Sequence, residues 1–147
     1  MSEISVLSNQ YNKLVETSDK VNNSVIVYKK KKLLSEPSNL KKYPKLFISS
    51  DDSDLAKSTL LSFLTNLKQI LEEDRKESDF IPSIVLEDYK KKLDANQYLK
   101  EDIESLITFI DKDQVISEEN ISILDGIMSV LDNERNILFR KLRTARG

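Results

Sequence analysis

The 147-residue sequence contains no cysteine and no histidine. Without cysteine, the chain has no disulfide bond, no thiolate metal site and no cysteine nucleophile. Without histidine, it lacks the commonest general base of enzymes and the commonest side-chain ligand of transition metals. These two absences remove two of the residue types on which catalytic sites are most often built. We therefore predict that the chain is not an enzyme and that it binds no cofactor and no metal.

Glycine and proline are also scarce. Only Gly126 and Gly147 are present, whereas tight hairpins and phosphate-binding loops need glycine where φ is positive. No proline follows Pro82, which permits long helices in the rest of the chain. No apolar run approaches the length of a membrane span, and the first residues lack the features of a secretory signal. We expect an all-α protein that does not enter the membrane and is located in the cytoplasm.

The first fifty residues predict a long helix, over residues 3–33, followed by a connector. Apolar side chains recur at alternating spacings of three and four, the pattern of a coiled-coil seam. Such a narrow seam pairs either with a helix of the same chain or with a second chain. The seam consists of Ile4, Leu7, Tyr11, Leu14, Val21, Val25 and Tyr28, with Ser18 in one slot.

The connector, residues 35–53, contains two prolines and many serines. Its apolar residues predict that it packs across the bundle. They are Leu40, Tyr43, Leu46, Phe47 and Ile48.

Apolar positions at helical period predict further helices over residues 53–76, 82–94, 99–111 and 117–145. The last helix opens at Ser117, a typical N-cap residue. Its apolar arc is too wide for contact with one neighbouring helix, so it lies centrally or has a second apolar face for another protein. We expect one domain over residues 1–147, a bundle of four to five mostly antiparallel helices with long first and last helices and a proline-containing connector.

The small net charge of −2 conceals a strong segregation of charge along the chain. Residues 1–50 carry nine lysines and four acids, and residues 51–134 carry nine cations and twenty-one acids. Residues 135–147 carry five cations and no acid. Either folding brings the basic ends against the acidic middle, or the ends form a basic face for an acidic partner or a phosphate backbone.

Arginine is concentrated at the C-terminus, where four of the five arginines lie in the last thirteen residues. Arginine recognises phosphate and carboxylate groups through paired hydrogen bonds, whereas cations at a helix end also complement the helix dipole. Arg135 falls within the apolar stripe near Asp132 and Glu134, so it either forms an internal ion pair or anchors a partner chain. The candidate contact residues for a partner or a nucleic acid are Arg135, Phe139, Arg140, Lys141, Arg143 and Arg146.

These features together predict a non-enzymatic interaction module, a small subunit or adaptor in a larger assembly. Its partner would be another protein or a second copy of the chain. One alternative is a helical nucleic-acid-binding subunit that contacts phosphates through its basic C-terminal helix, although the acidic middle weighs against it. Another alternative is a Mg²⁺-dependent enzyme that uses carboxylates such as Glu101, Asp102 and Glu104. Acids at a helix start more often complement the helix dipole.

Overall fold

The computed structural model describes residues 3–42, 47–73, 75–96 and 100–146, which contain six helices and no strand. The all-α bundle with long first and last helices is therefore confirmed. The connector holds an additional short helix that the sequence pattern did not indicate. The helices are α1 (Glu3–Leu34), α2 (Pro37–Lys42), α3 (Ser50–Glu73), α4 (Ser83–Ala95), α5 (Lys100–Asp111) and α6 (Glu118–Arg146).

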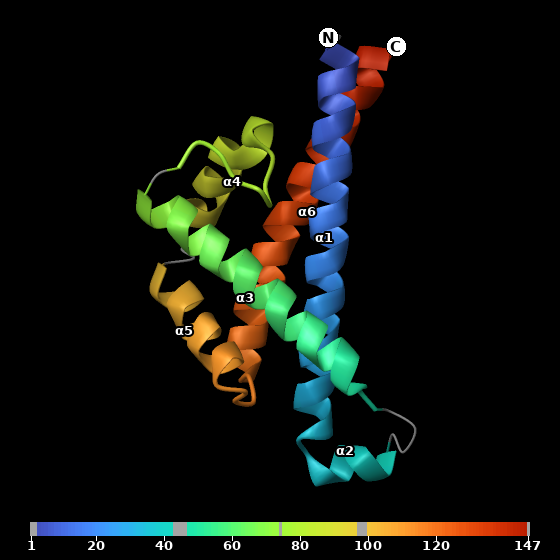
Figure 1. Ribbon diagram of the computed structural model, residues 1–147, viewed down its shortest axis with the longest axis vertical. Helices are drawn as coiled ribbons and strands as arrows, with labels where there is room; N and C mark the ends of the chain where they lie inside the picture. Colours follow the sequence, from blue (N-terminus) through green and yellow to red (C-terminus); the bar gives the residue numbers. More distant parts are fainter. Residues whose placement is uncertain (1–2, 43–46, 74, 97–99, 147) are drawn as a thin grey trace.

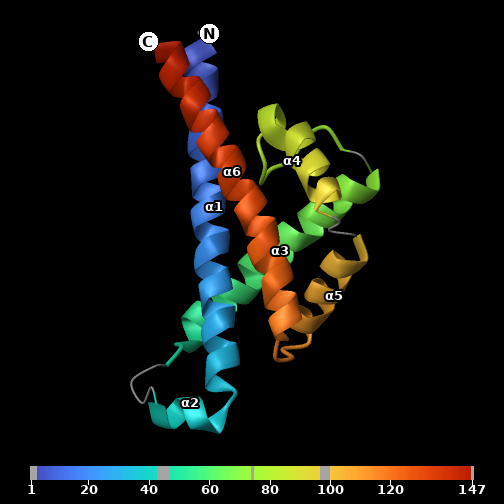
Figure 2. The same ribbon diagram turned by 180° about the vertical axis from the view of Figure 1, so that it is seen from behind.

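The two longest helices, α1 and α6, lie side by side in opposite directions, so that both ends of the chain are at the same end of the molecule (Figures 1 and 2). Helix α3 crosses this pair obliquely and packs against α1 and α5. Helix α6 packs against α1, α4 and α5. The wide apolar arc of α6 is thus accounted for by a central position, the first of the two predicted explanations.

Serine side chains cap the starts of two helices. The Asp52 amide donates to Ser49 Oγ at 3.1 Å, and the Asn120 amide donates to Ser117 Oγ at 3.1 Å. Each bond satisfies a backbone donor that has no partner within its helix. Ser117 was the predicted cap of the last helix. Helix α3 begins three residues before the predicted start because Ser49, and not a later serine or aspartate of residues 50–54, provides the cap.

The prediction that the connector packs across the bundle was wrong for the part of the connector that the structure describes. Helix α2 lies at the far end of α1 from the chain termini (Figure 1), and Phe47 is 79% exposed. Pro37 begins a new helix shortly after α1 ends, and this turns the chain away from the core. Tyr43 and Leu46 lie outside the described residues, as does the side chain of Leu40.

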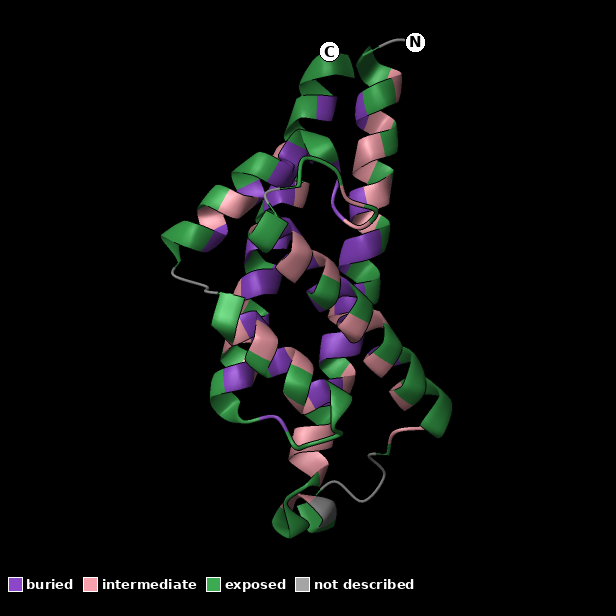
Figure 3. Ribbon diagram, turned by 60° about the vertical axis from the view of Figure 1, so that its left-hand side comes forward, coloured by how far each residue is buried: buried purple, intermediate pink, exposed green. Residues whose placement is uncertain are grey.

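Burial is uneven along the α1–α6 pair (Figure 3). In the middle of the pair, Leu14 of α1 and Leu131 and Leu138 of α6 are fully buried. Toward the chain termini, the last buried residues of the described part are Leu7 and Leu142. The core therefore thins toward this end, where the two helices extend beyond most of their neighbours.

Candidate partner-binding surface

The predicted seam of α1 is used inside the molecule. Leu7, Leu14, Val21 and Tyr28 are buried, and Tyr11 packs against the core while partly exposed. Because α1 packs against α6 and α3, the seam pairs with helices of its own chain. Its first residue differs, since Ile4 is 38% exposed.

The polar slot of the seam, Ser18, is completely buried and has a partner on α6. Ser18 Oγ donates to Asp132 Oδ1 at 2.7 Å, and Asn22 Nδ2 donates to the same oxygen at 3.2 Å. A buried hydroxyl without a partner costs free energy, so this contact favours one register of the two helices. Asp132 therefore accepts hydrogen bonds from two residues of α1, and the ion pair of Arg135 is with Asp19 instead.

Arg135 forms an internal ion pair, as one of the two predicted alternatives required. Its Nη1 atom lies 2.9 Å from Asp19 Oδ1 on α1, and its side chain is partly buried. Desolvation disfavours the charged guanidinium, but hydrogen bonds with Asp19 and Tyr11 outweigh this effect and raise the pKa of Arg135. Since this cation is already engaged by α1, we leave Arg135 out of the proposed binding surface.

Phe139 lies one turn beyond Arg135 and is 43% exposed. Its ring centroid is 5.7 Å from that of Tyr11 on α1, in a tilted arrangement. The guanidinium carbon of Arg143 lies 6.0 Å from the same centroid, the range of a cation–π contact. The predicted neighbours Phe139 and Arg143 are thus brought together on the surface.

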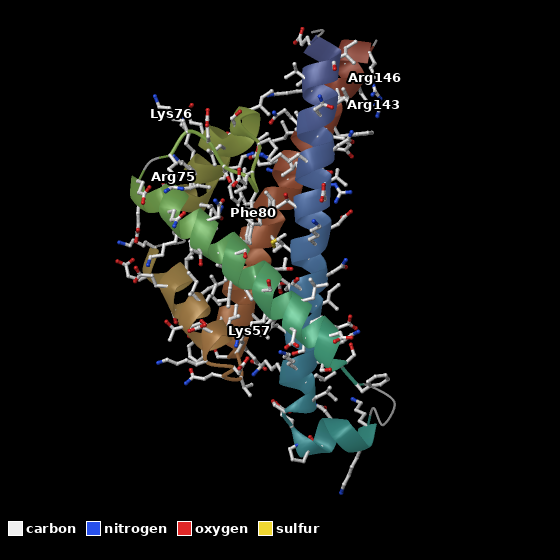
Figure 4. The ribbon with its side chains drawn as sticks, viewed as in Figure 1. Lys57, Arg75, Lys76, Phe80, Arg143 and Arg146 are labelled. Carbon is white, nitrogen blue, oxygen red and sulfur yellow. The ribbon has the colours of Figure 1, made fainter. Side chains whose placement is uncertain are left out.

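The remaining C-terminal cations have no acidic partner in the described part of the chain. Arg140, Lys141, Arg143 and Arg146 are all exposed, and none forms an ion pair with a described carboxylate. We call these four residues the basic end. Figure 4 shows Arg143 and Arg146 projecting from the end of α6 beside the start of α1.

Elsewhere in the molecule, many cations are neutralised by a nearby carboxylate. One of these contacts, Lys29–Asp125, joins a basic end of the sequence to its acidic middle, as the first explanation of the charge segregation predicted. The pairs include Lys20–Glu16, Lys29–Asp125, Lys57–Asp113, Lys68–Glu104, Arg75–Glu73, Lys91–Glu87 and Lys100–Glu72. The basic end differs because residues 136–146 contain no acid, and the opposing residues 3–11 contain one, Glu3.

A groove of about 740 Å³ opens beside the basic end, between α1, α6 and the start of α4. Aliphatic side chains that are buried or partly exposed line it together with two of the four cations. Ile84 of α4 is 43% exposed there, although Ile4 and Leu7 of α1 lie close to the same space. The lining residues are Glu3, Ile4, Leu7, Ile84, Arg140, Lys141, Thr144 and Ala145. Cations and uncovered apolar side chains therefore meet at one place on the surface.

Sequence reasoning missed an ionic cluster between α4 and α6, which we call the Glu134 cluster and of which only Glu134 is buried. Lys92 Nζ lies 2.5 Å from Glu134 Oε1 and 2.8 Å from Asp88 Oδ2. Glu134 is only 1% exposed. Its position between Leu131 and Leu138, in the middle of the apolar stripe, is the signal that predicts burial of a charge.

The surroundings of the cluster shift its pKa values in opposite directions. Burial raises the pKa of the Glu134 carboxyl, and a hydrogen bond that only its protonated form can donate to Asp88 raises it further. The same hydrogen bond and that from Lys92 lower the pKa of Asp88. Burial disfavours the charged Lys92, but its bonds with the two carboxylates prevail and raise its pKa.

The described residues contain no group of acids placed to hold a metal ion. Of the carboxylates considered for magnesium, Glu104 lies with its Oε1 atom 3.3 Å from Lys68 Nζ. Asp102 also has an interaction partner. The described part of the chain thus offers no carboxylate cluster on which the magnesium hypothesis can be built.

Comparisons of the chain with protein-family models, with curated proteins and with solved structures find no match. Within the described residues, no helix is both long enough and apolar enough to cross a bilayer.

Proposed function

We propose that this chain is a non-enzymatic helical interaction module, a small subunit or adaptor of a larger protein assembly that meets its partner through the basic end. The observation that carries the proposal is the set of four cations without a described acidic partner, beside uncovered apolar side chains. Exposed cations next to apolar surface are typical of the rim and centre of a protein interface. The apolar arc of α6 does not contribute, because neighbouring helices cover it.

Charge reversal at the basic end tests this proposal. The variant R140E/K141E/R143E is expected to recover at least about tenfold less partner than the wild type when the tagged chain is purified from its native cells, because like charges then face the partner. The measurement is the amount of co-purified protein relative to bait, after nuclease treatment.

The matched control is K41E/K76E/K112E, which reverses three exposed lysines elsewhere in the molecule. It changes the net charge by the same amount, so it separates a local effect from a general one. Equal recovery of a partner by wild type and both variants would contradict a role of the basic end.

A nucleic acid is the second candidate partner, favoured by the exposed Phe139 ring with the Arg143 guanidinium beside it. Proteins that bind single-stranded nucleic acids stack the bases on aromatic rings and contact the phosphates with arginines. The test is fluorescence anisotropy with single-stranded DNA, duplex DNA and RNA at two salt concentrations. If this candidate binds, affinity falls as salt rises. Each of Arg140→Ala, Arg143→Ala and Arg146→Ala then makes the slope of log affinity against log salt about one unit less steep. Absence of binding at low salt would contradict it.

A further inference from the structure

The groove at the basic end is lined by aliphatic side chains, which we call its floor, and by cationic side chains. Leu7 is buried beneath it, while Ile4 and Ile84 remain 38% and 43% exposed. Ala145 adds a small side chain that leaves room for close approach. This floor is formed by three helices that are far apart in sequence, since Ile4 is on α1, Ile84 is on α4 and Ala145 is on α6.

We infer that this groove is the docking site for an acidic, amphipathic helix of a partner protein, an inference that rests on the proposed function. Amphipathic helices bind by laying their apolar face into a groove between helices, with apolar residues at spacings of three and four. Ile4 and Ile84 supply uncovered surface for such residues. Burial of that surface is the favourable contribution expected on binding.

The charges of the groove select the sign of the partner. Arg140 and Lys141 lie along one side of the groove, and Arg143 and Arg146 extend the positive charge beyond it. Glu3 is the single acid among the lining residues. Acidic side chains on the outer face of the docked helix would meet the cations of α6 at the rim, where they accelerate and orient association.

The chemistry of the floor favours a protein over a nucleic acid as the occupant. Stacking of bases requires aromatic rings or guanidinium planes, whereas the apolar side chains of this groove are aliphatic. The ring of Phe139 does not line the groove, and it already contacts Tyr11 and Arg143.

A second group of exposed apolar side chains lies near the start of α3, but its charges do not favour a partner of one sign. Ile26 and Leu55 line a groove there whose charged lining residues are Lys20, Lys30 and Asp52. Lys20 is already paired with Glu16, which leaves one cation and one acid. Its mixed charge selects no partner, so we use this second groove as the control site.

The inference is tested by fluorescence polarisation with two labelled synthetic peptides of about 18 residues, long enough to form a helix. One peptide carries leucines at spacings of three and four on one face and glutamates on the other. The second has the same composition, with its leucines placed so that they share no face. The protein variants are I4S/I84S for the groove and I26S/L55S as the matched control. Since all four side chains are exposed, both variants should fold, which circular dichroism checks.

The inference expects the patterned peptide to bind at least about fivefold more tightly than its rearranged form, and I4S/I84S to weaken it about tenfold. I26S/L55S should leave its binding unchanged. Equal binding of both peptides, sensitive to R140E/K141E/R143E but not to I4S/I84S, would overturn the groove and leave the proposed function standing. Failure of both peptides to bind a chain that still co-purifies a partner through its basic end would also overturn only the groove.

Two further outcomes would show that the groove binds something other than a partner helix. Concentration-dependent self-association that I4S/I84S abolishes, measured by light scattering, would overturn a foreign helix in favour of a second copy of the chain. Salt-sensitive binding of single-stranded DNA without binding of either peptide would overturn it in favour of a nucleic acid.

Discussion

Replacement of Lys92 by methionine is expected to lower the free energy of unfolding by about 3 kcal/mol at neutral pH. Methionine keeps the apolar stem of the side chain but removes the ammonium that lies 2.5 Å from Glu134 Oε1. Because Glu134 is almost completely buried, its carboxylate would then lack a cation in a region of low dielectric constant. The measurement is urea denaturation followed by circular dichroism.

The destabilisation should depend on pH in a defined direction. Burial raises the pKa of Glu134 from its usual value of 4.5, so the folded state favours the protonated carboxyl more than the unfolded state does. Without Lys92, the cost of the ionised carboxyl is absent below that value and grows as the pH rises through the raised pKa. The difference between wild type and Lys92→Met should therefore be smaller at about pH 5 than at neutral pH.

Two variants serve as controls for the Glu134 cluster. Lys91→Met removes a neighbouring lysine whose contact with Glu87 is largely exposed, and its expected cost is below about 0.5 kcal/mol. The double variant Lys92→Met/Glu134→Gln should recover part of the lost stability, because the carboxylate that remains, Asp88, is exposed to solvent and no uncompensated charge is left buried. A loss for Lys92→Met that equals that of Lys91→Met would show that the cluster does not stabilise the fold.

Truncation of Leu131 to alanine is the second large effect, with an expected loss of about 3 kcal/mol in the free energy of unfolding. Leu131 is fully buried in the middle of α6, which has α1, α4 and α5 as neighbours. A cavity enclosed by several helices cannot collapse easily, so the cavity adds to the lost burial of the side chain.

The control for this truncation is Leu55→Ala. Leu55 is 66% exposed on α3, and its replacement should change stability by less than about 0.5 kcal/mol. Chemical denaturation of both variants measures the difference. Similar losses at the two positions would contradict the central place of α6 in the core.

Helical periodicity predicted the fold well because it depends on local sequence. The stripes of α1 and α6 are visible from spacing alone, and Ser117 is recognisable as a cap from its place before two acids. Periodicity reports how wide an apolar face is but not which helices cover it. The central position of α6 and the pairing of the α1 seam within the chain therefore required the structure.

Long-range pairing explains why parts of the candidate site could not be predicted. Arg135 has acids nearby on its own helix, yet its partner is Asp19, separated from it by 116 positions. The groove at the basic end likewise combines Ile84 of α4 with Ile4 of α1, and no local pattern relates the two. The prediction for the connector failed for a different reason. The apolar Phe47 suggested packing against the core, but the helix that begins at Pro37 turns the chain away from the core.

Site-specific photo-crosslinking in native cells tests most directly whether the basic end is the binding surface. A photoreactive amino acid would replace Phe139 or Ile84, which lie beside the basic end, and Val115 or Leu55 as exposed control positions elsewhere. We predict a discrete crosslinked protein at Phe139 and Ile84 and none at the two controls. Adducts at the control positions alone, or at none of the four, would contradict the account.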